Sequence, residues 1–144
     1  MKVIKPIPPS EEALNGLWVL EAASFSDPWS KESLANYLSN PLCRSAGVCI
    51  HGVWAAYGLL QAIAGEGEIL RLAVLPSFRR KGLGEAVLSA LMSEKDLSAV
   101  FLEVRAHNKA AISLYEKAGF VSCGLRPHYY QNPEEDALLM RSFR

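Results

Sequence analysis

A short basic segment with two glycines, Arg79-Arg80-Lys81-Gly82-Leu83-Gly84, restricts most strongly how this chain can fold. It follows an apolar run from Ile69 to Leu75 and precedes an amphipathic run from Leu83 to Met92, which predicts a strand, a loop and a helix in that order. Glycine lets a backbone approach a ligand closely, and the free amides at a helix start attract an anion. Three cations beside them suit a phosphate ester, although a basic turn before a helix is also a common solvated loop.

Length and composition favour one domain, residues 1–144, because the chain is long enough for a hydrophobic core and half of it is apolar. Fifteen basic and fifteen acidic residues give no net charge, so we expect no nucleic-acid or membrane partner and only a local anion site. The N-terminus lacks the apolar core of a signal peptide, and no run approaches a membrane span, which favours a cytoplasmic protein. The scattered cysteines and histidines predict no metal site, with a catalytic Cys–His pair as a minor alternative.

The rest of the pattern predicts two early helices, capped by Ser10 and Ser30, followed by strands and helices in alternation. The expected strands are 2–6, 45–50, 53–62, 68–74, 100–104, 120–125 and 137–143. One later helix is expected from Gly82 to about Lys95, and another follows Asn108 and ends at Gly119. This order indicates an α/β fold in which a mixed central sheet carries helices on both faces.

Two polar side chains interrupt apolar elements. Glu103 lies in the strand 100–104, and burial of an unpaired carboxylate is costly. It therefore needs an ion-pair partner such as Arg105, contact with water, or a cavity in which it acts as a general base. Tyr115 lies on the apolar stripe of its helix, and this spacing alone favours an ordinary core tyrosine. Asn108 is adequately explained as a helix cap.

Two longer motifs resemble those of the GNAT family, the acetyl-CoA-dependent N-acetyltransferases. Residues 72–84, which contain Arg79-x-x-Gly82-x-Gly84, are similar to the acetyl-CoA motif of that family. Residues 108–120, with the sequence NKAAISLYEKAGF, are similar to its second motif, N-x-x-A-x-x-L-Y-x-x-x-G-F. The match is closest to the bacterial RimI-type branch, which acetylates the N-terminal α-amine of a small-subunit ribosomal protein. The residues that carry this closer likeness are Phe25–Ser30, Leu102–Arg105, Arg126–Tyr130 and Glu135–Met140.

The resemblance implies a single GNAT-type domain, acetyl-CoA as co-substrate and a protein N-terminus as acceptor. It implies direct attack of a primary amine on the thioester, with Glu103 as general base and Tyr115 as general acid. The residues implied to bind the cofactor are Leu72, Ala73, Val74, Arg79, Arg80, Lys81, Gly82, Leu83, Gly84, Glu85 and Asn108. Those implied to contact the acceptor are Trp29, Arg71, Tyr129 and Tyr130.

The chain departs from relatives at Arg71, where Asn is frequent, at Leu75, where Asp is common, and at His107, where Ser is common. Because Arg71 and Leu75 flank the strand implied to bind the pantetheine arm, acceptor choice is left open. A lysine, a polyamine or another small amine is an alternative acceptor, and a non-catalytic acetyl-CoA sensor is an alternative function. The aromatic segment 126–130 is predicted to be a loop, which forms either a packed corner or a wall that contacts substrate. The sequence leaves the oligomeric state open.

Overall fold

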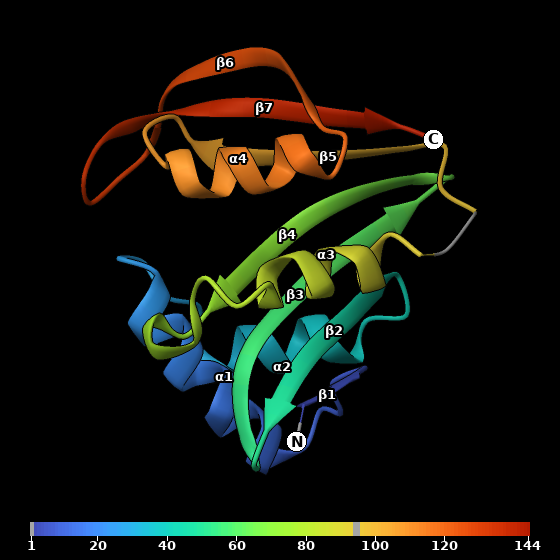
Figure 1. Ribbon diagram of the computed structural model, residues 1–144, viewed down its shortest axis with the longest axis vertical. Helices are drawn as coiled ribbons and strands as arrows, with labels where there is room; N and C mark the ends of the chain where they lie inside the picture. The colour runs from blue at the N-terminus through green and yellow to red at the C-terminus, as the bar shows by residue number, and fades with distance from the viewer. Residues whose placement is uncertain (1, 94–95) are drawn as a thin grey trace.

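Seven strands form one mixed β-sheet in the computed structural model, which describes residues 2–93 and 96–144 (Figure 1). Their spatial order is β1-β2-β3-β4-β5-β7-β6, and every neighbouring pair is antiparallel except β4 and β5. The strands are β1 (Lys2–Lys5), β2 (Cys43–Ile50), β3 (Val53–Ile63), β4 (Glu66–Val74), β5 (Ala99–Arg105), β6 (Val121–Tyr130) and β7 (Glu135–Phe143).

Four α-helices accompany the sheet in the described ranges: α1 (Glu11–Ser24), α2 (Lys31–Ser39), α3 (Leu83–Leu91) and α4 (Lys109–Lys117). The three predicted caps are confirmed. The Ser10 Oγ accepts from the Ala13 N–H at 3.2 Å, and the Ser30 Oγ accepts from the Ser33 N–H at 3.1 Å. The Asn108 Oδ1 accepts from the Ala111 N–H at 3.2 Å. Each bond satisfies an amide that the first helical turn would otherwise leave unpaired.

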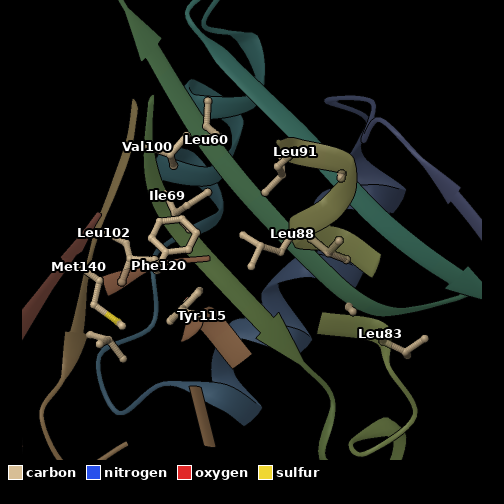
Figure 2. Packing of buried hydrophobic residues seen from close by; sticks show 14 of the residues in the cluster. Leu60, Ile69, Leu83, Leu88, Leu91, Val100, Leu102, Tyr115, Phe120 and Met140 are labelled. Atoms are coloured by element: carbon tan, nitrogen blue, oxygen red, sulfur yellow. The ribbon is translucent and has the colours of Figure 1, made fainter. Parts of the chain in front are cut away.

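The two faces of the sheet are covered by different helices, as the sequence predicts. Successive side chains of a strand point to opposite faces, so β3 divides its residues between two apolar clusters. Tyr57 and Leu59 pack with residues of α1 and α2. Ala56 and Leu60 pack with residues of α3 and α4, in the cluster shown in Figure 2. The expected α/β fold with helices on both faces is therefore confirmed.

The parallel pair β4 and β5 separates part-way along its length. Residues Glu66–Ile69 lie opposite Ala99–Leu102, and the register between the two strands ends there. Beyond that point β4 pairs with β3 alone, and β5 pairs with β7 alone. The backbone edge of β4 from Leu72 to Val74 is thus without a strand partner on the β5 side. Figure 1 shows the two ribbons diverging at this place.

The aromatic segment 126–130 belongs to β6, so its prediction as a loop is wrong. Tyr130 pairs with Glu135 of β7, with an irregular register between Arg126 and Tyr130. Because β6 is an edge strand, Pro127 is tolerated, since one side of the strand needs no donor. Almost the whole strand is solvent-exposed, so its sequence lacks the alternation of apolar and polar residues that marks a half-buried strand.

The helix expected from Gly82 to about Lys95 is shorter, because α3 ends at Leu91. The Met92 N–H closes the last turn, and the Ser93 Oγ donates to the Ala90 carbonyl at 2.8 Å, which competes with continuation of the helix. Lys95 itself lies outside the described residues. Within the described ranges, none of the helices combines the length and the apolar character needed to cross a bilayer.

Candidate active site

A cavity of about 750 Å³ opens where β4 and β5 separate. It is bordered by the connection between α1 and α2, by the diverging halves of β4 and β5, by the start of α4 and by the end of β6. Eight of the predicted catalytic, cofactor-binding and acceptor-binding residues line it: Trp29, Arg71, Leu72, Glu103, Asn108, Tyr115, Tyr129 and Tyr130. The structure thus brings both predicted catalytic residues and all four predicted acceptor contacts to one place.

One carboxylate oxygen of Glu103 has no hydrogen-bond partner among the residues that the structure describes. This oxygen, Oε2, is buried, while Oε1 lies 3.6 Å from the Arg126 Nη2. The side chain is 21% exposed. The ion pair considered between Glu103 and Arg105 is wrong, because Arg105 binds Glu135 at 3.2 Å instead. An oxygen left unpaired at a cavity can accept a proton from a bound group.

Tyr115 belongs to the hydrophobic core and also lines the cavity between β4 and β5. The residue is 7% exposed, and its ring packs edge-to-face on Phe120 with centroids 5.8 Å apart (Figure 2). Burial, followed by the nearby Tyr130 hydroxyl, raises the pKa of Tyr115 above its usual value. The hydroxyl therefore stays protonated at neutral pH and can donate a proton.

Two tyrosines at the end of β6 form part of the cavity wall. The rings of Tyr129 and Tyr130 meet edge-to-face with centroids 5.0 Å apart. The guanidinium of Arg126 lies 5.0 Å from the Tyr129 centroid, and that of Arg105 lies 4.6 Å from the Tyr130 centroid. Burial and the Glu103 carboxylate raise the pKa of Tyr130 to about 12. Both rings are thus held in place by neighbouring cations.

Arg71 is held inside the protein by a fully buried carboxylate, Glu21. Its Nη2 donates to the Glu21 Oε1 at 2.9 Å and to the Asp27 carbonyl at 3.2 Å. The guanidinium lies 3.9 Å from the Phe25 ring centroid and 4.3 Å from that of Trp29. Arg71 therefore positions the aromatic connection between α1 and α2. The Glu21 carboxylate balances its charge, although Arg71 also lines the cavity.

Glu21 is a residue whose importance the sequence analysis missed. Besides Arg71, it accepts from the Trp29 N–H at 2.7 Å and from the Tyr57 hydroxyl. The signal was present as a carboxylate on the apolar face of α1, at the spacing of Leu17 and Leu20. Its partners lie on β3, on β4 and in the loop after α1, which local spacing does not reveal.

Glu21→Gln should lower the free energy of unfolding by about 2–3 kcal/mol, because it leaves the Arg71 charge without its counter-ion. The value is below that of a fully buried pair, since the Arg71 side chain is 16% exposed. Urea denaturation measures the change. Glu11→Gln is a suitable control, because Glu11 lies exposed in the first turn of the same helix. Equal stability of the two variants would contradict a structural role for the Glu21 carboxylate.

Alkaline pH should destabilise the fold through three tyrosines, Tyr57, Tyr115 and Tyr130. Burial is the largest cause that raises the pKa of each hydroxyl in the folded state. The unfolded chain therefore loses these protons first, near pH 10. The associated stability is fully present below that pH and is lost as the pH rises through the folded values. Melting temperatures measured from pH 8 to 11 should begin to fall only as the pH approaches about 10, and Tyr57→Phe should make the decline shallower.

The basic segment lies at the other end of the free β4 edge. Gly82 adopts the left-handed conformation with φ of 77°, and no side chain of the described residues caps the first turn of α3. A Cβ on Gly84 would approach the Leu114 Cδ2 to 3.2 Å, so glycine keeps the start of α3 close to α4. Arg79 donates from Nε to the Val74 carbonyl at 3.1 Å. Uncapped amides beside exposed cations fit a diphosphate.

The family of acetyltransferases known as GNAT matches residues 14–120 of this chain. The chain belongs to the GNAT acetyltransferase family. Members use acetyl-CoA, and this protein is accordingly an acetyl-CoA-dependent N-acetyltransferase. The expected family, fold, enzyme class and co-substrate are therefore confirmed, whereas the roles of single residues stay predictions.

Bacterial relatives and a solved structure are similar over most of the chain. The [ribosomal protein bS18]-alanine N-acetyltransferase of Escherichia coli K12 is 34% identical over 131 residues, which cover 84% of each chain. The enzyme of that name from Salmonella typhimurium is 34% identical over 137 residues, which cover 88% of each chain. The crystal structure of the ribosomal-protein-S18-alanine N-acetyltransferase from Escherichia coli superposes with a TM-score of 0.89 at 30% identity, covering 99% of this chain and 94% of that one.

Proposed function

We propose that this N-acetyltransferase acts on the N-terminal α-amine of a protein and that its acceptor class is the alanine N-terminus of a ribosomal protein. The observation that carries the proposal is the cavity between β4 and β5, which is lined both by Glu103, whose Oε2 has no hydrogen-bond partner among the described residues, and by the protonated Tyr115. The names of relatives at 34% identity over most of the chain support the acceptor class.

The charges around the cavity favour an amine as the acceptor. Glu21 balances Arg71, and Glu135 balances Arg105, so neither arginine presents an uncompensated positive charge. Glu103 instead presents a carboxylate whose contact with Arg126 is long, at 3.6 Å. Such a site attracts an ammonium group and can then remove its proton.

The fraction of acceptor amine that is unprotonated at neutral pH favours an α-amine over a lysine. At pH 7 an α-amine with a pKa near 8 is roughly 10% neutral, whereas a lysine with a pKa near 10.4 is about 0.04% neutral. A single carboxylate, acting directly or through a water molecule, can therefore remove the proton of an α-amine more easily than that of a lysine. In our proposal Glu103 takes the proton from this amine, and Tyr115 donates a proton to the leaving sulfur.

The residues along the free edge of β4 and at the start of α3 suit acetyl-CoA, which supplies the acetyl group as an activated thioester. Backbone groups of Leu72–Val74 have no β5 partner and can bind an extended arm. The uncapped amides of Leu83, Gly84 and Glu85 would bind the diphosphate. Arg79, Arg80 and Lys81 would add full positive charges there, and Asn108 lines the cavity as a further contact.

The proposal is tested with peptides that begin with Ala or Ser, matched peptides with a blocked N-terminus, and peptides with an internal lysine alone. We expect transfer from labelled acetyl-CoA to the free N-terminus of the Ala peptide and none to the blocked peptide. A polyamine is tested in parallel as an acceptor. Acetylation of the lysine peptide or the polyamine, without acetylation of any free peptide N-terminus, would overturn the α-amine assignment. Binding of acetyl-CoA without transfer to any amine would indicate a sensor. A whole-ribosome extract then identifies the protein that is labelled.

Direct transfer requires that no cysteine becomes acetylated on the way. Cys43 and Cys49 are partly buried, Cys123 is exposed, and none of them lines the cavity between β4 and β5. Intact-protein mass spectrometry after incubation with acetyl-CoA alone should show no added acetyl group. An acetylated Cys49 or Cys123 that transfers its group to the peptide would contradict direct attack.

A further inference from the structure

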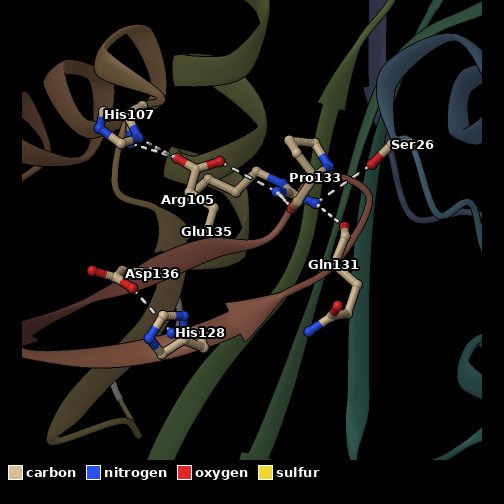
Figure 3. A network of polar contacts seen from close by, with 8 residues as sticks. All are labelled: Ser26, Arg105, His107, His128, Gln131, Pro133, Glu135 and Asp136. Atoms are coloured by element: carbon tan, nitrogen blue, oxygen red, sulfur yellow. Dashed lines mark hydrogen bonds and ion pairs between the residues drawn. The ribbon is translucent and has the colours of Figure 1, made fainter.

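One side chain, Arg105, contacts both the turn between β6 and β7 and the connection between α1 and α2, and all three line the cavity between β4 and β5 (Figure 3). Its Nη1 donates to the Pro133 carbonyl at 2.8 Å, and its Nη2 donates to the Gln131 carbonyl at 2.7 Å. Both carbonyls belong to the turn between β6 and β7. The same Nη2 lies 3.4 Å from the Ser26 Oγ, in the connection between α1 and α2.

The charge of Arg105 is balanced outside the cavity, on the side of Glu135. The Glu135 Oε1 accepts from Arg105 at 3.2 Å, and its Oε2 accepts from the His107 N–H at 2.7 Å. The His107 N–H, followed by Arg105, lowers the pKa of Glu135, so that this carboxylate remains ionised at neutral pH. The guanidinium is therefore fixed in orientation without being offered to the substrate as a free cation.

Arg105 also shares a face of β5 with the predicted base. Residues two apart on a strand point to the same side, so Glu103 and Arg105 both reach the cavity from one strand. The Arg105 guanidinium lies 4.6 Å from the Tyr130 ring centroid. It thus sets the position of an aromatic wall beside the carboxylate.

We propose that Arg105 is a positioning residue for the acceptor, because it holds Tyr130 and the 131–134 turn against Ser26 and so fixes the wall that the acceptor contacts. The inference rests on the proposed function and extends it to a residue for which the sequence suggested only an ion pair. A lysine cannot replace it, since an ammonium group lacks the planar fork that reaches two carbonyls and a carboxylate together.

The test compares Arg105→Gln, Arg105→Lys and Glu135→Gln with the control Arg141→Gln on β7, whose guanidinium packs on Phe143 away from the cavity. Steady-state kinetics are measured with an N-terminal Ala peptide and with acetyl-CoA varied separately. We expect the peptide KM to rise roughly tenfold to a hundredfold in both Arg105 variants, with a smaller rise for Glu135→Gln. We expect little change in kcat or in the KM for acetyl-CoA, the signature of lost acceptor binding.

Hydrogen exchange of the ligand-free proteins provides a readout that does not depend on activity. Exchange in the 131–134 turn should accelerate in Arg105→Gln and Arg105→Lys but not in Arg141→Gln. An unchanged peptide KM in folded Arg105→Lys, or unchanged exchange in the turn, would overturn the inference. If the unmodified enzyme acetylates no α-amine while the exchange rates respond as expected, the proposed function fails and the structural role of Arg105 stands without a role in acceptor binding.

Discussion

Tyr115→Phe is expected to lower kcat roughly 10²- to 10⁴-fold, the range typical of loss of a general acid. The substitution removes one hydroxyl and keeps the ring that packs on Phe120, so the fold should persist. Because the proton is needed only when the sulfur leaves, the affinity for acetyl-CoA should change little. Steady-state kinetics with a saturating Ala peptide give kcat, and calorimetry with acetyl-CoA gives the dissociation constant.

Tyr37→Phe is the matched control for this experiment. Tyr37 stacks on Trp29 with centroids 4.5 Å apart, and it does not line the cavity. Its hydroxyl can be removed while the stacked rings persist, so the control should retain its kcat. A Tyr115→Phe enzyme with the kcat of the Tyr37 control would return Tyr115 to the hydrophobic core, the assignment that helical spacing alone favoured.

Local chemistry made much of the fold predictable from the sequence. Ser10, Ser30 and Asn108 were identified as caps because a helix start needs an acceptor side chain within three residues. β6 was underpredicted because it is an exposed edge strand, where no buried face imposes an alternating pattern. Helix α3 was overpredicted because the apolar period continues to Met92, while the chain after Leu91 turns away.

The site was predictable where a motif carries it and unpredictable where pairing is long-range. The basic segment and the Asn108–Phe120 motif led to Glu103 and Tyr115 through a resemblance, and both residues line the cavity between β4 and β5, while their catalytic roles stay predictions. Glu21 and Arg71 are 50 residues apart, and no local pattern indicates that they form an ion pair. Arg105 was likewise considered as a partner of its near neighbour Glu103, whereas its actual partner, Glu135, comes from the antiparallel strand β7.

Glu103→Gln is expected to lower kcat/KM roughly 10²- to 10⁴-fold at pH 7, because the amide keeps the shape of the side chain but cannot accept the proton. The loss should be greatest at acidic pH, where almost all of the acceptor is an ammonium ion. As the pH rises past 8, the α-amine loses its proton in solution, which can restore at most about tenfold of the lost activity relative to pH 7. A profile of kcat/KM from pH 6 to 9.5 measures this rescue.

Glu66→Gln provides the control, since Glu66 is an exposed carboxylate at the start of β4 and lies outside the cavity between β4 and β5. Its pH profile should match that of the unmodified enzyme. The shape of the Glu103→Gln profile separates two roles that a loss of activity alone would not distinguish. A loss of equal size at every pH would mean that the carboxylate only maintains the cavity through its contact with Arg126, because a missing base must matter less once the amine is already neutral.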